Sequence, residues 1–263
     1  MTNPKPLAVV TGASSGIGFE LAKVFAENGF DLLVNAEDQG LDAAAEQLRT
    51  AGAEVQPVRT DLSTYEGVEQ LYSAIVSSGR PVSAAALNAG VGQGGAFIDT
   101  DLADEIEIID VNVTSTVHLA KRLLKDMASR NDGRVLITSS VASTMPGSFQ
   151  AVYNASKSFL QSFAQALQNE LKDTDVTITA LMPGPTDTNF FHRADMDGTK
   201  IGQQSKDDPV QVAKQGFDAL TGGKNKIIAG SATTKAQGVA GKVLPDKLKA
   251  AAHRQMAAPG SGE

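Results

Sequence analysis

Short apolar runs alternate with longer amphipathic segments along this chain, beginning close to its amino terminus. The apolar runs predict strands at Leu7–Thr11, Asp31–Asn35, Glu54–Val58, Val82–Leu87, Arg134–Ser139, Val176–Met182 and Lys226–Ala229. Several of them are continuously apolar, which is typical of a parallel sheet that is covered on both faces. Segments with a helical period lie between them, at Gly16–Asn28, Leu41–Ala51, Tyr65–Ser77, Leu102–Ser129, Ala151–Leu171 and Val210–Leu220.

Repeated strand–helix–strand units with short connections indicate an α/β fold, a doubly wound parallel sheet of about seven strands with helices on both faces. No repeat or linker interrupts the pattern, so one domain over residues 1–256 is expected. Within it, the polar and aperiodic segment Phe190–Asp208 is expected to form a mobile substrate lid, at residues 190–208. The small, polar residues Ala257–Glu263 are expected to be a disordered tail.

Composition and charge exclude several classes of function. The formal charge is −7, from 23 basic and 30 acidic residues, and no basic run reaches three residues, which argues against a nucleic acid or an anionic membrane as partner. The absence of cysteine excludes disulfides, thiolate catalysis and Cys-ligated zinc. The apolar run Leu7–Val10 is too brief for a signal peptide, and no segment approaches the roughly 20 apolar residues of a spanning helix. A cytoplasmic protein with a small-molecule substrate is therefore expected.

A glycine-rich loop follows the first predicted strand and opens the first predicted helix. Its sequence is Thr11-Gly12-Ala13-Ser14-Ser15-Gly16-Ile17-Gly18. Gly12 allows a tight turn, Gly16 allows close approach of the backbone to a pyrophosphate, and Gly18 removes a side chain where the helix packs. The free amides at the helix N-terminus favour an anion. Position in the strand–loop–helix unit therefore favours nucleotide binding over a purely structural turn.

Tyr153 and Lys157 lie four residues apart at the start of a predicted amphipathic helix. This spacing brings the phenol and the ammonium to one helix face. A neighbouring cation stabilises a phenolate and so lowers the tyrosine pKa from its ordinary value near 10. The pair alone is common on helix surfaces, but with the loop and with Ser140 upstream it indicates acid/base chemistry.

The spacing G-x-x-x-G-x-G and these residues resemble the short-chain dehydrogenase/reductase family over roughly residues 5–230. The resemblance implies a Rossmann-like core, a bound NAD(H) or NADP(H), and a homodimer or homotetramer. It also implies hydride transfer between the nicotinamide and a ketone or secondary alcohol.

The same resemblance suggests roles for four residues. Tyr153 resembles the proton donor to a carbonyl or acceptor from an alcohol, and Lys157 the residue that lowers its pKa and holds the nicotinamide ribose. Ser140 resembles the hydroxyl that orients the substrate oxygen, with Ser139 as the alternative. Asn112 resembles the asparagine that kinks its helix and holds a water in a proton relay.

Further cofactor contacts are implied by the family pattern. Asp61-Leu62 resembles an adenine contact, although a helix N-cap is an equal interpretation, and Asn88-Ala89-Gly90 is expected to pack beside the adenine and steady the sheet. After the sixth strand, Thr188 is the best choice for the carboxamide contact, with Met182–Gly184 lining the ring. The loop and these segments together supply the candidate cofactor residues Gly12, Ser14, Ser15, Gly16, Ile17, Gly18, Glu37, Asp61, Leu62, Asn88, Ala89, Gly90, Tyr153, Lys157, Pro183, Gly184, Thr186 and Thr188.

The residues after the second strand bear on the choice of cofactor. A carboxylate there bonds a ribose 2′-hydroxyl, whereas a basic residue binds a 2′-phosphate. The chain has Glu37-Asp38 and no nearby basic residue, and Ser15 stands where NADP-preferring relatives often have one. NAD(H) is therefore favoured over NADP(H), with a solvated helix-start acid as the other interpretation of Glu37.

The last third of the chain bears on the substrate. It lacks the Val-Asp-Gly-Gly type of ending usual in carrier-linked 3-oxoacyl reductases of the family. Instead, Asp207-Asp208-Pro209 begins a helix, and a tail around Leu244-Pro245-Asp246 leads to a helical segment, Lys247–Met256, that docks on the core or on a neighbouring subunit. The expected lid carries apolar side chains, which suggests a medium-sized, uncharged ketone or secondary alcohol; these are Phe190, Phe191, Met196 and Ile201.

Other functions remain open at this point. One is a nucleotide-sensing regulator without turnover, and others are a carrier-linked 3-oxoacyl reductase and an epimerase or dehydratase with the same core. None of the histidines, His118, His192 and His253, has a spacing partner for a metal or a triad, so no metal site is expected. Each is interpreted as structural or solvated, with His192 as the one that would line the substrate pocket.

Overall fold

The computed structural model describes residues 4–240 and 245–262, so Met1–Asn3, Leu244 and Glu263 of the segments discussed above lie outside the described residues. Its sheet has seven parallel strands in the order β3-β2-β1-β4-β5-β6-β7. The strands are β1 (Leu7–Thr11), β2 (Asp31–Ala36), β3 (Val55–Arg59), β4 (Val82–Leu87), β5 (Gly133–Thr138), β6 (Val176–Pro183) and β7 (Lys226–Ala229). This order places a topological switch between β1 and β4, where open α/β sheets bind ligands.

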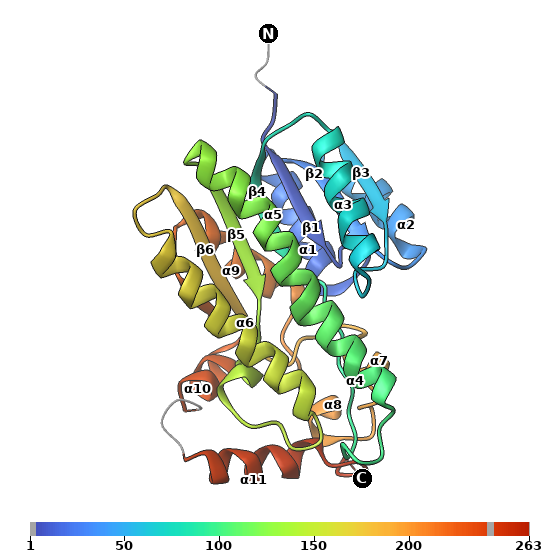
Figure 1. The fold of residues 1–263 in the computed structure, drawn as a ribbon. Helices are drawn as coiled ribbons and strands as arrows, with labels where there is room; N and C mark the ends of the chain where they lie inside the picture. The colour runs from blue at the N-terminus through green and yellow to red at the C-terminus, as the bar shows by residue number, and fades with distance from the viewer. Residues whose placement is uncertain (1–3, 241–244, 263) are drawn as a thin grey trace.

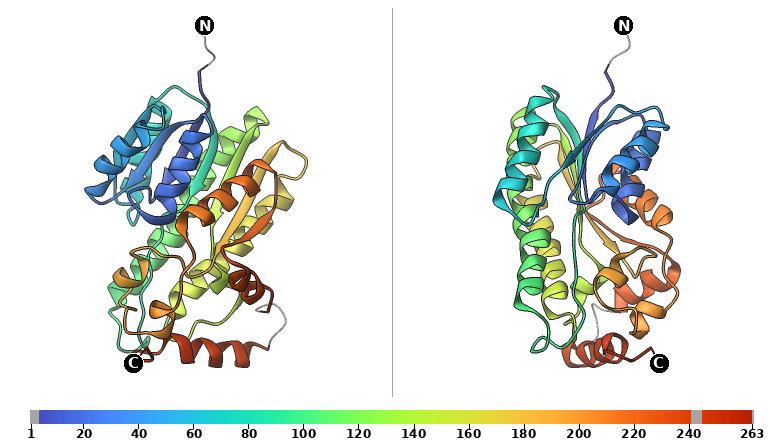
Figure 2. Two further views of the ribbon diagram at one scale, coloured as in Figure 1. Left: turned by 180° about the vertical axis from the view of Figure 1, so that it is seen from behind. Right: turned by 90° about the vertical axis from the view of Figure 1, so that its right-hand side faces the viewer.

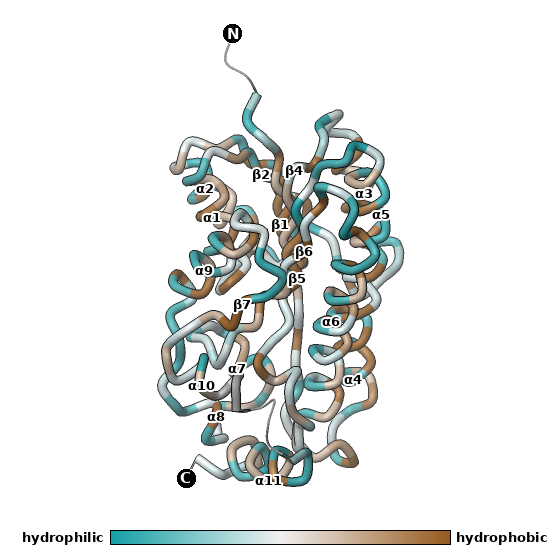
Figure 3. The backbone as a smooth tube through the Cα atoms, turned by 90° about the vertical axis from the view of Figure 1, so that its left-hand side faces the viewer, coloured by the Kyte–Doolittle hydropathy of each residue, from teal (hydrophilic) through white to brown (hydrophobic). Residues whose placement is uncertain are grey.

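Helices cover both faces of the sheet, as Figures 1 and 2 show. One face carries α1 (Gly16–Glu27), α2 (Gly40–Arg49) and α9 (Pro209–Thr221), and the other carries α3 (Tyr65–Ser77), α5 (Ser115–Arg130) and α6 (Ala151–Glu170). Two separate cores result, and the strands between them are the most hydrophobic part of the chain (Figure 3). Their continuous apolar runs are explained by this double coverage. The predicted doubly wound, Rossmann-like fold is confirmed.

The predicted helix Leu102–Ser129 differs from the structure in its middle. The chain there forms α4 (Leu102–Ile108), then a π-helical turn η1 (Ile109–Thr114), and then α5. The widened turn contains the fully buried Asn112, whose amide bonds to a neighbouring loop. Because this distortion depends on a tertiary contact, the helical period alone did not reveal it. The other predicted strands and helices agree with the structure within two residues.

Short helices gather at the carboxyl ends of the strands (Figure 1). They are η2 (Val141–Thr144), α7 (Phe190–Arg193), α8 (Lys200–Gln203), α10 (Ala232–Ala240) and α11 (Asp246–Ala257). The expected lid thus contains α7 and α8. Ala257, expected to begin a disordered tail, is the buried last residue of α11. The following residues contact the lid, since the amide of Gly262 donates to the Gly198 carbonyl.

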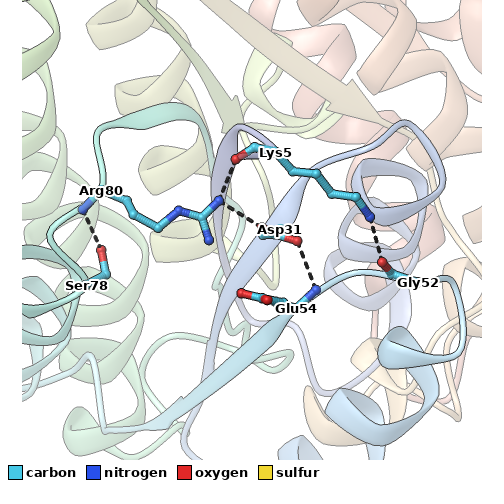
Figure 4. Close-up of polar contacts among 6 residues, drawn as sticks. All are labelled: Lys5, Asp31, Gly52, Glu54, Ser78 and Arg80. Carbon is cyan, nitrogen blue, oxygen red and sulfur yellow. Dashed lines mark hydrogen bonds and ion pairs between the residues drawn. The ribbon is translucent and has the colours of Figure 1, made fainter. Parts of the chain in front are cut away.

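Polar contacts join the strands at the opposite, amino-terminal edge of the sheet (Figure 4). Arg80, just before β4, donates to the carboxylate of Asp31 at 2.8 Å and to the main-chain carbonyl of Lys5. Asp31 also accepts from the amide of Glu54 at 2.9 Å, and the Lys5 ammonium donates to the Gly52 carbonyl at 2.6 Å. These contacts link the approaches to four strands, so this edge is closed by structural contacts while the loops at the carboxyl edge surround the cavity.

Candidate active site

A cavity of about 400 Å³ lies at the carboxyl ends of the strands. Its walls come from the loops after the first six strands, β1 to β6, from the start of α6, and from the lid and α11. Of the candidate catalytic and cofactor residues, Asp61, Asn112 and the fully buried Met182 do not line it, and the others do. The lining candidates are Gly12, Ser14, Ser15, Gly16, Ile17, Gly18, Glu37, Leu62, Asn88, Ala89, Gly90, Ser140, Tyr153, Lys157, Pro183, Gly184, Thr186 and Thr188.

The glycine-rich loop has the geometry of a narrow cradle. Gly12 and Gly16 have positive φ angles of +67° and +56°, which a residue with a side chain rarely adopts. A Cβ on Gly18 would lie 2.0 Å from the carbonyl oxygen of Gly12, so helix and loop pass at backbone contact. Ser15 is the N-cap of α1, and its hydroxyl makes no capping hydrogen bond. The first amides of α1 are therefore available to an anion, and the loop fits the pyrophosphate of a dinucleotide.

Asn88 connects three central strands at the floor of the cavity. Its amide nitrogens donate to Thr11 of β1, and its carboxamide oxygen accepts from the Thr138 hydroxyl of β5 at 3.1 Å. The Thr11 hydroxyl also accepts from the amide of Ala89 at 3.0 Å. These bonds agree with the expected role of this segment in steadying the sheet. Gly90 is tightly enclosed, since a Cβ there would lie 3.1 Å from the Lys157 ammonium.

Asn112 lies behind the cavity wall. Its Nδ2 donates to the Val91 carbonyl at 3.0 Å and to the Ser156 hydroxyl at 2.9 Å, and its Oδ1 accepts from the Val91 amide at 2.9 Å. The π-helical turn therefore brings α6 and the loop after β4 to one buried amide. Asn112 kinks its helix as expected, and its part in a proton relay stays a prediction.

Tyr153 and Lys157 occupy successive turns of α6, which begins at Ala151. The Lys157 ammonium lies 5.7 Å from the centroid of the tyrosine ring and donates to the Thr138 carbonyl at 3.1 Å. Lys157 is buried, whereas Tyr153 is partly exposed to the cavity. The helical spacing thus brings both groups to the same wall.

The two serines after β5 have different partners. The Ser139 hydroxyl donates to the Lys157 carbonyl at 2.8 Å, within the contact between β5 and α6. The Ser140 hydroxyl caps η2 by accepting from the Ala142 amide at 3.1 Å, and it donates to the Pro183 carbonyl at 3.3 Å. Its hydrogen bond with the Tyr153 side chain acts to lower the pKa of the phenol. Geometry therefore favours Ser140 over Ser139 as the hydroxyl that meets a substrate oxygen beside the phenol.

Burial dominates the electrostatics of the pair. It raises the pKa of Tyr153 to about 12, although the hydrogen bond from Ser140 acts in the opposite direction. It lowers the pKa of Lys157 to about 8. The expected lowering of the tyrosine pKa by Lys157 is thus not what this structure shows, because the loss of water outweighs the distant cation. Tyr153 is held as a neutral phenol, which is the form that donates a proton.

The far end of the cavity carries the acidic residues. Asp38 is engaged within the loop, since it accepts from the Ser14 hydroxyl at 2.6 Å and from the Gly40 amide at 2.8 Å. Glu37 is exposed and lines the cavity. Arg193, from the lid helix α7, lines the cavity as well. Burial and the nearby carboxylates, that of Glu37 first, raise the pKa of Glu107 at this end, and Arg193 only partly opposes that rise. The sequence has no basic residue close to Glu37 and Asp38, as stated above. In the folded chain, however, the lid brings Arg193 to the same cavity.

Asp61 does not face the cavity. Its carboxylate accepts from the Ser63 amide at 2.8 Å, and the N-cap of α3 is Thr64. Thr60 and Leu62 line the cavity on either side of it. The structure therefore gives Asp61 a turn role in place of the helix N-cap, and its contact with the adenine stays a prediction.

The loop after β6 is held by a buried carboxylate that sequence reasoning assigned only to the start of α9. Asp207 accepts from the Thr234 hydroxyl at 2.5 Å and from the Ser231 amide at 2.9 Å. Its main chain pairs with the loop around Thr186. The methyl group of Thr188 approaches the glycine-rich loop so closely that a Cβ on Gly16 would lie 3.0 Å from it. The two candidate cofactor loops thus lie against each other.

The lid and α11 cover the end of the cavity beside Tyr153. The Phe190 ring lies 5.2 Å from the Tyr153 ring, and Phe191 and Ile201 also line the cavity, whereas Met196 packs behind Phe191. Four lining residues of α11 were missed by sequence reasoning, because they lie far along the chain from every family motif. They are Lys249, Ala252, His253 and Met256. Their spacing along one helix face was the available signal.

The histidines lie at three different places. His118 contacts Glu69 at 2.5 Å, and the exposed His192 contacts Asp197 at 2.6 Å, so His192 does not line the cavity. His253 is the histidine that does. Within residues 4–240 and 245–262, no group of three His, Cys, Asp or Glu side chains is arranged to hold a metal ion. In the same ranges no helix combines the length and apolarity needed to cross a bilayer.

A family model described as short chain dehydrogenase matches residues 6–197. The chain is 31% identical over 233 residues to dehydrogenase/reductase SDR family member 7B of Rattus norvegicus, covering 84% of this chain and 71% of that protein. It is 34% identical over 192 residues to a Streptomyces coelicolor protein named as a ketoacyl reductase, covering 71% and 73%.

Two solved structures resemble the chain at 26% identity. A short-chain dehydrogenase from Sphingobium yanoikuyae in complex with NADPH aligns with a TM-score of 0.79, covering 85% of this chain and 87% of that chain. One from Burkholderia phymatum in complex with NAD aligns with a TM-score of 0.78, covering 87% and 90%. A nicotinamide cofactor is common to both, while its phosphorylation differs.

Proposed function

The chain belongs to the short-chain dehydrogenase/reductase family and is an NAD(P)-dependent oxidoreductase, and from this premise we propose that it interconverts medium-sized, uncharged ketones and secondary alcohols. One observation carries the proposal. The neutral phenol of Tyr153, bonded to Ser140 and adjacent to Lys157, faces a cavity whose lining is mostly apolar. Such a site gives a proton to an oxygen and admits an uncharged molecule.

The bound nicotinamide supplies or accepts the hydride, and the protein supplies the proton and the electrostatic stabilisation. In the direction of reduction, Ser140 and Tyr153 hold the carbonyl oxygen by hydrogen bonds. As negative charge develops on that oxygen, the phenolic proton moves to it, so Tyr153 is left as a phenolate. Oxidation runs the same proton transfer in reverse.

Lys157 stabilises the phenolate that proton transfer leaves behind. Its pKa of about 8 keeps the ammonium mostly protonated at neutral pH, despite burial. In a site with little water, a cation at this distance acts more strongly than it does in solution. We assign Lys157 to this role and to the ribose hydroxyls, and Asn112 to positioning α6 against the loop after β4.

We propose NAD(H) as the preferred cofactor. The exposed carboxylate of Glu37 suits a ribose hydroxyl, and it repels a 2′-phosphate with its charge of about −2. Arg193 also lines this end of the cavity, and its positive charge would attract a 2′-phosphate and so oppose the effect of Glu37. Comparing kcat/KM for NADH and NADPH tests the preference, and Glu37→Gln is expected to improve the use of NADPH relative to NADH. Equal values for both cofactors in the wild type would contradict it.

The similarity to a protein named as a ketoacyl reductase favours a second candidate, reduction of a carrier-linked 3-oxoacyl group. The covered end of the cavity, where α11 and the lid meet, favours free ketones instead. Assays with simple ketones and with a 3-oxoacyl thioester of the same acyl length distinguish the two. Activity confined to the thioester would support the second candidate.

A spectrophotometric panel of ketones and secondary alcohols, run with both cofactors, tests the proposed function directly. Turnover of uncharged ketones supports it, and a strong preference for small charged oxo acids contradicts it. Nucleotide binding without any turnover would instead support a nucleotide-sensing regulator. An epimerase or dehydratase would convert its substrate with no net change in nicotinamide absorbance.

We also propose a homodimer or homotetramer. Large apolar side chains are exposed along α4 and on α6, among them Leu102, Ile106 and Phe159. Contact between copies would remove this surface from water. Light scattering measures the assembly directly. The cytoplasmic location stays a prediction from the sequence, which cell fractionation would test.

A further inference from the structure

Helix α11 forms one wall of the cavity, and none of its residues has a role in the mechanism proposed above. Lys249, Ala252, His253 and Met256 all line the cavity. Because they are three or four residues apart, they share one helix face. Figure 1 shows α11 lying across the carboxyl end of the domain, below α6 and α8.

Contacts with the segment between Ser140 and Tyr153 hold α11 in place. Ser148 donates from its hydroxyl to the Ala250 carbonyl at 3.2 Å, and its own carbonyl lies 2.9 Å from Nδ1 of His253. Lys249 donates to the Thr144 carbonyl at 3.0 Å, and the Arg254 guanidinium lies 5.0 Å from the centre of the Phe149 ring. The helix is therefore coupled to the backbone that positions the catalytic residues.

The contact with Ser148 determines the protonation pattern of His253. A carbonyl oxygen only accepts hydrogen bonds, so the proton lies on Nδ1. Burial lowers the pKa of His253 below its ordinary value, although the bond to Ser148 acts in the opposite direction. At neutral pH the ring is therefore neutral, and Nε2 carries a lone pair.

The lone pair on Nε2 has no partner within the described residues, although only 5% of the His253 surface is exposed. Nε2 nevertheless keeps some exposed surface. In the described residues, the unpaired polar side-chain atoms with no exposed surface are Asn35 Oδ1, Asn154 Oδ1 and Thr177 Oγ1. Since His253 lines the cavity, its small exposed part opens there. An accessible acceptor thus stands beside the apolar Ala252 and Met256.

We propose that His253 is a specificity-determining residue that accepts a hydrogen bond through Nε2 from an uncharged donor on the substrate. The preferred substrate is then a ketone with a second polar group, a hydroxyl or amide N–H, remote from its carbonyl. This inference rests on the proposed function, because it takes the cavity to hold a ketone. A ligand that lacks the donor would leave the acceptor buried and unpaired, which is the basis of discrimination in such sites.

Matched pairs of ketones provide the test. One series consists of 2-alkanones of increasing chain length with a terminal hydroxyl, and the other carries a methyl group in place of that hydroxyl. For the wild-type enzyme, kcat/KM at the best chain length is expected to favour the hydroxylated ketone by about fivefold to tenfold. The same ratio is then measured for His253→Phe, which keeps a planar ring without the acceptor, and for His253→Gln, which retains an acceptor on a flexible chain.

The ratio of kcat/KM for the hydroxylated ketone to that for its methyl analogue is expected to fall to about 1 in His253→Phe, chiefly through a change in KM. In His253→Gln the ratio is expected to lie between 1 and the wild-type value. Leu248→Ala, an exposed position on the same helix, is the matched control and keeps the wild-type ratio. An unchanged ratio in His253→Phe overturns the inference. So does a wild-type enzyme that favours the hydroxylated ketone at no chain length, a result that does not depend on the folding of any variant. Failure of the proposed function is seen separately, as no turnover of either series.

Discussion

The ammonium of Lys157 lies 5.7 Å from the centre of the Tyr153 ring and is bonded to the main-chain carbonyl of Thr138. The ammonium is thus bonded to the end of β5. Among the contacts of the described residues, none joins it to the phenolic oxygen. Burial meanwhile favours the neutral form of each group. In the proposed mechanism, Lys157 therefore contributes most after proton transfer, when Tyr153 carries a negative charge.

Replacing Lys157 by Met is expected to raise stability while it impairs catalysis. Because the folded-state pKa of about 8 lies below the ordinary value of 10.5, the unfolded state binds more protons between these two pH values. Wild-type stability consequently rises with pH through this window, and the buried charge is destabilising below it. Lys157→Met is expected to be more stable by up to about 2 kcal/mol at pH 7, since the lost bond to Thr138 offsets part of the gain.

Urea denaturation of both proteins from pH 7 to pH 10.5 measures this effect. The advantage of Lys157→Met should shrink as pH rises, while its kcat falls by about 10²-fold or more at pH 7. A variant less stable than the wild type, by a margin that does not change with pH, would show that the ammonium is not destabilised by burial.

Ser140→Ala and Ser139→Ala form a matched pair. Removing the Ser140 hydroxyl takes away a hydrogen bond to Tyr153, so kcat/KM is expected to fall by about 10²-fold with a modest change in Tm. Ser139→Ala removes a bond between β5 and α6, so stability should fall by about 1 kcal/mol with most of kcat retained. The reverse assignment of the two effects, read from kinetics and thermal unfolding, would show that Ser139 meets the substrate.

Gly18→Ala tests the cradle. A Cβ there would lie 2.0 Å from the Gly12 carbonyl, so the loop must move and nucleotide affinity should fall by at least about tenfold. Gly198→Ala is the control, since a Cβ at that lid position would meet nothing within 4 Å. Calorimetric titration with NADH measures both affinities. If Gly18→Ala binds NADH as tightly as Gly198→Ala does, the loop is not the phosphate site.

The sheet was predictable because its central strands are buried on both faces and so have continuous apolar runs, as in Leu7–Thr11. The glycine loop and the Tyr153–Lys157 pair were predictable because local spacing sets their geometry. Contacts between distant segments were not. The π-helical turn at Asn112 depends on Val91, and the acceptor at His253 depends on Ser148, so neither follows from local periodicity. Electrostatics depends on burial in the same way, which reversed the expected shift of the tyrosine pKa.

The most direct test of the account is the kcat/KM of Tyr153→Phe with a ketone substrate at pH 7, measured beside its affinity for NADH. Phe retains the ring and its contact with Phe190, and it removes only the hydroxyl that we propose as the proton donor. Turnover is expected to fall by about 10³-fold or more, with nucleotide affinity within about threefold of the wild type. Turnover near the wild-type level would show that Tyr153 is not the proton donor and would contradict the proposed mechanism.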